Sequence, residues 1–132
     1  MKTPTSLLRK LGRLLPALLL TAAACNAFRR GGSAPEPATI YFANESLDQA
    51  DVYAVAQSGD YRRIGTVMAG RTDTLTVPSS MLASGGSLNI YVRLLASSRR
   101  PQTGPVTMFG GEAYLVRLPS DERLLSFLPA GE

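Results

Sequence analysis

The stretch Leu88-Asn89-Ile90-Tyr91-Val92-Arg93-Leu94 decides the expected fold, because apolar and polar residues alternate along it without a break. Successive side chains of a β-strand point to opposite faces of a sheet. The alternation therefore predicts a strand with one buried face and one face turned to solvent. We expect the rest of the domain to supply further strands that cover the apolar face.

Short runs of similar character occupy most of the chain around this strand. We expect strands over residues 39–43, 52–56, 61–67, 72–77, 106–109 and 113–118. Residues 79–83 suit a single helical turn with a serine cap, and residues 97–104 read as a polar loop. Ser58-Gly59-Asp60 predicts a hairpin turn, and Gly110-Gly111 predicts a second hairpin between 106–109 and 113–118, because glycine tolerates the positive φ of tight turns.

The last segment, residues 120–128, fits two structures. Ser120-Asp121-Glu122 would cap a helix, whereas an apolar run after a turn suits a closing strand. We favour the strand, because only about six residues precede Pro129, half the length of a typical helix.

Taken together, the runs predict an all-β fold over residues 38–132. Short strands at spacings near ten residues, with no long helix after the N-terminal region, indicate a single small antiparallel β-sandwich of about seven strands.

Residues 1–24 have the three parts of an export signal. A basic region holds Lys2, Arg9, Lys10 and Arg13, an apolar run covers 14–20, and small residues cover 21–24. The apolar part is eleven residues from Leu14 to Ala24, whereas a transmembrane helix needs about 20. We therefore expect this segment to be a removable signal peptide, which places a signal helix and then a flexible linker before the sandwich.

Ala22-Ala23-Ala24-Cys25 resembles the lipobox of bacterial lipoprotein precursors. The resemblance implies cleavage before Cys25, which would carry a diacylglyceryl group on its sulfur and a fatty acid such as palmitate on its amine. Two or more acyl chains hold a protein stably on a bilayer. By the same resemblance, Asn26 after the cysteine favours the outer membrane, with the domain facing the periplasm. The alternative is an ordinary A-x-A cleavage site, which would release a soluble periplasmic or secreted protein.

Residues 25–37 are expected to form the acylated cysteine and a flexible tether, since Gly and Pro are frequent and no apolar period is present. Removal of the signal would leave ten arginines, no lysine and ten acidic residues. A neutral chain of this kind does not favour nucleic acid as a partner. The anchor makes the membrane one partner, and an envelope protein is the second that we expect.

The chain also resembles small bacterial envelope lipoproteins with a prealbumin-like or immunoglobulin-like sandwich. The matching features are the paired runs 51–55 and 63–67, the proline-ended strand Thr76-Val77-Pro78, and Leu118-Pro119-Ser120-Asp121 before the last strand. The resemblance covers residues 38–128, implies the sandwich fold, and carries no known activity.

The residue types needed for most catalysis are missing. The chain has no histidine and one cysteine, and its lysines all lie before residue 25, which excludes Ser-His, Cys-His and histidine–zinc sites and, in the mature chain, Ser-Lys pairs. We therefore expect no enzyme and no cofactor, with a hydrolase that uses only carboxylates as the alternative.

Two groups of residues are candidates for ligand contact. Asn44, Glu45, Asp48 and Asp51 form the densest oxygen cluster, and calcium prefers oxygen ligands, although polar residues also belong in turns. Arg99 and Arg100 share a loop and could bind anionic groups of a glycan such as peptidoglycan, or remain solvated. The main expectation is a protein-binding or scaffolding module, with glycan binding as the alternative.

Overall fold

The structure, a computed structural model, describes residues 35–82 and 87–131. The expected signal peptide and signal helix at residues 1–24, the cleavage site, Cys25 and most of the tether lie outside these residues. Pro35–Glu132 forms one compact unit. Within its described part, no helix is long and apolar enough to cross a membrane.

The described residues form eight strands and one helical turn. The strands are β1 (Ala38–Asn44), β2 (Ala50–Ala56), β3 (Tyr61–Val67), β4 (Thr72–Val77), β5 (Ser87–Leu94), β6 (Gln102–Thr107), β7 (Ala113–Leu118) and β8 (Ser126–Pro129), and α1 covers Ser79–Leu82. The all-β prediction is confirmed, as are the short helical turn and the strand rather than helix in the last segment.

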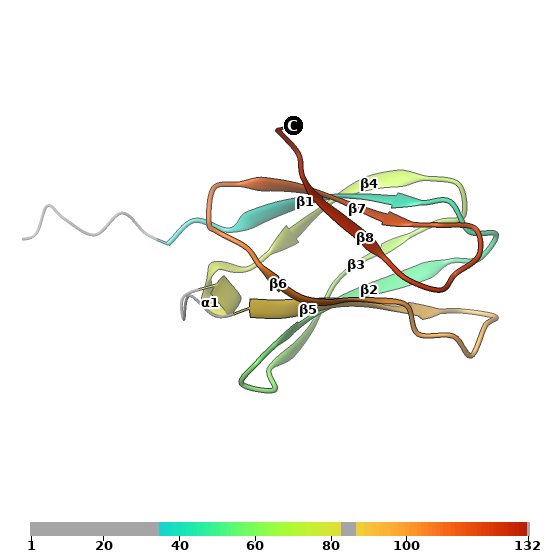
Figure 1. Ribbon diagram of the computed structural model, residues 1–132, viewed down its shortest axis with the longest axis horizontal. Helices are drawn as coiled ribbons and strands as arrows, with labels where there is room; N and C mark the ends of the chain where they lie inside the picture. The colour runs from blue at the N-terminus through green and yellow to red at the C-terminus, as the bar shows by residue number, and fades with distance from the viewer. Residues whose placement is uncertain (1–34, 83–86, 132) are drawn as a thin grey trace, which may run out of the picture. The chain divides into compact units, whose positions relative to one another are not determined.

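The strands form two four-stranded sheets, with the order β4-β1-β7-β8 in one and β3-β2-β5-β6 in the other (Figure 1). Most neighbours are antiparallel, as expected, but β1 and β7 run parallel, with Ile40 opposite Tyr114. The sandwich is therefore mixed rather than purely antiparallel. Local turn chemistry cannot reveal this pair, because β1 and β7 are separated in the sequence by most of the domain.

The core lies between the inner faces of the two sheets. The alternation that predicted β5 is realised, since Leu88, Ile90, Val92 and Leu94 are all buried. They belong to one cluster with Ile40 and Phe42 of β1, and with Val52 of β2. Burial of each large aliphatic side chain stabilises the fold by about 1.5–3 kcal/mol.

The predicted hairpin across Gly110-Gly111 is wrong. Strand β6 pairs with β5, and β7 pairs with β1 and β8, so this connection passes from one sheet to the other. The glycines serve a close approach instead: a Cβ on Gly110 would collide with the backbone oxygen of Glu36, and Gly111 has a φ of +80°. Gly111 also donates its backbone N–H to Pro37. The expected loop 97–104 is shorter than predicted, because β6 begins at Gln102.

Candidate functional site

The calcium candidates do not converge on one point. Glu45 forms an ion pair with Arg117 at 3.1 Å, and Asp51 lies on β2 with arginine partners of its own. Asp48 accepts hydrogen bonds from the backbone N–H groups of Gln49 and Ala96. Within residues 35–82 and 87–131, no group of three or more acidic or cysteine side chains is arranged to hold a metal ion.

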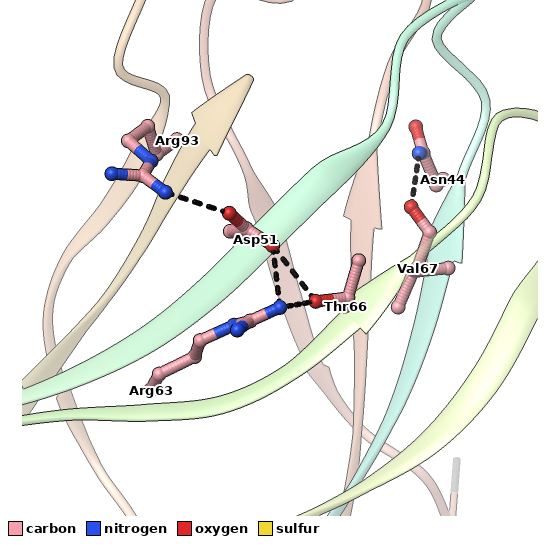
Figure 2. A network of polar contacts seen from close by, with 6 residues as sticks. All are labelled: Asn44, Asp51, Arg63, Thr66, Val67 and Arg93. Carbon is pink, nitrogen blue, oxygen red and sulfur yellow. Dashed lines mark hydrogen bonds and ion pairs between the residues drawn. The ribbon is translucent and has the colours of Figure 1, made fainter. Parts of the chain in front are cut away.

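Asn44 has a structural position at the end of β1. Its Nδ2 donates to the carbonyl oxygen of Asp48 at 2.8 Å and to that of Val67 at 3.1 Å. Its Oδ1 accepts from the backbone and side chain of Ser46. The bond to Val67, drawn in Figure 2, ties β1 of one sheet to β3 of the other.

The Arg99-Arg100 loop is exposed, as predicted. Arg99 donates from Nη1 to the backbone oxygen of Asp121 at 2.6 Å, and from its backbone N–H to Ser97 Oγ. One of the two guanidinium groups is thus engaged in joining this loop to the β7–β8 connection. The pair remains a candidate for anion contact through Arg100.

A larger polar cluster lies on the outer face of the β3-β2-β5-β6 sheet, over β3, β2 and β5. Its members are brought together by register in three cross-strand rows. Tyr61 faces Val55, which faces Asn89; Arg63 faces Tyr53, which faces Tyr91; and Thr66 faces Asp51, which faces Arg93. We call the set Asp51, Tyr53, Tyr61, Arg63, Thr66, Tyr91 and Arg93 the tyrosine–arginine face.

Asp51 is the polar centre of the tyrosine–arginine face. Its Oδ1 accepts from Arg63 Nη2 at 2.8 Å and from Thr66 Oγ1 at 2.7 Å, and its Oδ2 accepts from Arg93 Nη2 at 2.9 Å. Arg63 also donates to Thr66. Figure 2 shows the two arginines reaching the carboxylate from opposite sides, one from β3 and one from β5.

The Asp51 side chain is only 10% exposed, whereas those of Arg63 and Arg93 are 53% and 58% exposed. Burial by itself raises the pKa of Asp51, but the hydrogen bonds from Thr66 and Arg93 and the charges of both arginines outweigh it and lower the pKa overall. Asp51 is therefore a carboxylate at neutral pH. Two fixed guanidinium groups lie over it, so the cluster carries one net positive charge.

The three tyrosines pack on one another beside this cluster. The Tyr53 ring lies 4.7 Å from that of Tyr61, nearly parallel at 17°, and 5.3 Å from that of Tyr91 at 32°. Tyr53 is 7% exposed, but Tyr61 is 57% exposed. Partial burial raises the pKa of Tyr61, and the Tyr53 hydroxyl raises it further. The result is a continuous surface of aromatic rings next to two arginines.

This face was not predicted from the sequence, which placed Asp51 in an oxygen cluster with Asn44, Glu45 and Asp48. A signal was present: Asp51, Tyr53, Arg63, Tyr91 and Arg93 all fall at positions with polar or aromatic character that alternate with core residues. Only the register between strands, including the bulge beside Tyr53, shows which of them meet.

The outer face of the β4-β1-β7-β8 sheet differs from the tyrosine–arginine face. A shallow hollow of about 360 Å³ is lined by Tyr41, Leu115, Leu128, Pro129 and Ala130. This lining carries no charged side chain. It offers apolar contact without a group that would select a ligand.

Comparison with known proteins assigns neither a family nor a function to the chain. No family model matches the chain, and no curated protein sequence matches it. Among solved structures, a protein from Eubacterium rectale determined by NMR matches with a TM-score of 0.48 and 13% sequence identity, over 77% of this chain and 98% of that one.

Proposed function

We propose that the protein is a cell-envelope lipoprotein, held on the membrane through Cys25, whose β-sandwich is a non-catalytic protein-binding module. The single observation that carries the binding part is the tyrosine–arginine face, where exposed rings and two positioned guanidinium groups share one sheet surface.

The composition of this face supports a protein partner. Tyrosine and arginine are enriched at the residues that contribute most to protein–protein affinity. Tyrosine supplies a large contact area with few rotatable bonds, so little conformational entropy is lost on binding. The ring stacking and the Asp51 ion pairs further restrict these side chains before any partner arrives.

The anchoring part of the proposal rests on Ala22-Ala23-Ala24-Cys25 and on the signal-like residues before it. Acylation of Cys25 would keep the domain close to the outer membrane, on the periplasmic side, with residues 25–37 as the tether. A domain confined to a surface meets membrane-bound partners at a raised effective concentration, which suits a binding or scaffolding role.

The absence of histidine, together with the absence of lysine after residue 10, supports a non-catalytic role. The best-connected carboxylate, Asp51, is neutralised by two arginines, and its lowered pKa makes it a poor proton acceptor at neutral pH.

The experiment that tests the binding role is photo-crosslinking in intact cells. The photoreactive residue p-benzoylphenylalanine replaces Tyr61 in one full-length variant and Tyr41 in another. Both sites are exposed tyrosines on outer sheet faces, and they lie on different sheets. We expect a discrete product with an envelope protein from position 61 and a much weaker one from position 41. Equal products from both positions, or none from position 61, would refute the assignment of this face.

A further inference from the structure

Arg63 and Arg93 of the tyrosine–arginine face have N–H donors that form no hydrogen bond within the described residues. Among the described residues, Arg63 and Arg93 make their side-chain hydrogen bonds through Nη2, to Asp51 and, for Arg63, also to Thr66. A guanidinium group has five N–H donors in a planar fork. Both side chains are more than half exposed, so their Nη1 and Nε edges remain accessible to a ligand.

We infer that the partner presents an acidic protein segment to this face, with its carboxylates on Arg63 and Arg93 and its neighbouring side chains against Tyr61 and Tyr91. The inference rests on the proposed function and specifies the chemistry of the partner. Guanidinium and carboxylate groups match in a bidentate geometry, which gives both strength and orientation.

The positive charge of the cluster is complementary to an acidic segment. Two arginines share a single carboxylate, so the cluster has one net positive charge after its internal pairs are formed. Asp51 is the positioning residue: it lies between the two strands that carry the arginines, and both of its oxygens are engaged. The guanidinium groups are therefore held in place, and an acidic segment binds without first ordering them.

The arrangement of the rings favours a protein segment over a glycan. Sugar rings stack on free aromatic faces, but here Tyr61 already covers Tyr53 with a nearly parallel ring at 4.7 Å, and Tyr91 packs against both rings, at 5.3 Å from Tyr53 and 6.2 Å from Tyr61. What the tyrosines offer is a broad and partly exposed apolar surface. Such a surface suits the packing of protein side chains beside the charged contacts.

The test is binding of the purified full-length chain, in mild detergent, to immobilised poly-L-glutamate. We expect wild-type protein to bind, and Arg63→Ala and Arg93→Ala each to weaken binding about tenfold, as expected for loss of one charged hydrogen-bonded contact. Arg63→Lys keeps the charge but loses the fork, so it should weaken binding by a smaller factor. Binding should also decline as salt rises from about 0.1 M to about 1 M, because the Debye length shortens from about 10 Å to about 3 Å.

Arg117→Ala is the matched control. Arg117 is 53% exposed, like Arg63, and it also forms an ion pair, with Glu45, but it lies on the outer face of the other sheet. We expect this variant to bind poly-L-glutamate like the wild type. An equal loss in Arg117→Ala would show nonspecific attraction and would overturn the inference, as would failure of the wild type to bind.

Polygalacturonate, an acidic polysaccharide, provides the competing probe. Binding to polygalacturonate but not to poly-L-glutamate, lost in Arg63→Ala and Arg93→Ala, would overturn the inference in favour of a glycan. If position 61 crosslinks to an envelope protein while poly-L-glutamate does not bind, the acidic segment is refuted and the proposed protein-binding role stands.

Discussion

Arg93 donates a hydrogen bond from Nη2 to Asp51 Oδ2 at 2.9 Å, and the two residues face each other across strands β5 and β2. The other carboxylate oxygen accepts from Arg63 of β3. One acidic side chain on β2, an inner strand of its sheet, thus joins the strands on both of its sides. The contact has a structural consequence as well as the binding role that we propose, and the two can be measured separately.

Replacing Asp51 with asparagine should destabilise the domain by about 1–2 kcal/mol, because charged hydrogen bonds to two arginines are lost, while the exposure of those arginines limits the cost. Urea unfolding monitored by circular dichroism measures this change. Asp73→Asn, at an exposed acidic position of β4, should shift the midpoint by much less. Equal shifts in the two variants would contradict the role given to Asp51.

The contribution of Asp51 should also depend on pH. Its pKa is lower in the folded protein than the ordinary value of about 3.9, so protonation favours the unfolded chain. The stabilisation is therefore complete above about pH 4 and is lost as the pH falls through the folded-state pKa. The difference in unfolding free energy between wild type and Asp51→Asn should stay constant from pH 7 down to about pH 4 and shrink on further acidification. A difference that stays constant below about pH 4 as well would show that the carboxylate charge is not the cause.

Tyr53→Ala should destabilise the fold by about 2–4 kcal/mol, because the ring is almost fully buried and packs against both Tyr61 and Tyr91. Tyr53→Phe keeps the ring and should cost less than about 1 kcal/mol. Tyr41→Ala, at a tyrosine that is 42% exposed, is the control and should cost clearly less than Tyr53→Ala. Thermal unfolding of the three variants in one buffer ranks their losses of stability. A larger loss in Tyr53→Phe or Tyr41→Ala than in Tyr53→Ala would contradict the stacked arrangement.

Gly110→Ala should destabilise the domain by about 1–3 kcal/mol, because the added methyl group would meet the backbone oxygen of Glu36 and force the entering chain to move. Gly131→Ala is the matched control, since nothing lies within 4 Å of a Cβ at that position. Chemical denaturation of both variants tests the prediction. If Gly110→Ala left the free energy of unfolding unchanged, the segment before β1 would not pack against the β6–β7 connection.

Asn44→Ala should cost about 2–4 kcal/mol, because the carbonyl oxygens of Asp48 and Val67 lose their donor in a buried setting. Asn44→Asp keeps the acceptor for Ser46 but removes the Nδ2 donor, so it should be similarly harmful. The midpoints of urea unfolding check both. Full stability of Asn44→Asp would show that the link between β1 and β3 contributes little.

Several strands were predictable, because β1, β5 and β7 each bury one face and the period of two is visible in single runs. Leu88 to Leu94 alternates through its whole length, and β5 has this pattern in the structure. β6 was harder, since Gln102 is polar, Gly104 and Pro105 are residue types that are rare in strands, and this edge strand is only partly buried. Its pairing with β5 depends on tertiary contacts that composition does not reveal.

The pairing of strands far apart in sequence was not predictable. Gly110-Gly111 has the local chemistry of a hairpin, yet its glycines accommodate the chain at Glu36, a contact 74 positions away. The tyrosine–arginine face was missed for the same reason. Asp51, Arg63 and Arg93 each look like ordinary outward residues, and only the register of three strands assembles them.

The proposed role as a membrane-anchored protein depends on acylation of Cys25, and fatty-acid labelling tests this acylation. Cells producing the full-length chain or its Cys25→Ser variant are labelled with a palmitate analogue, and their membranes are separated from soluble proteins. We predict that the wild type carries label and sediments with the outer membrane, and that the variant loses both properties together. An unlabelled wild type in the soluble fraction would contradict the membrane-anchored role.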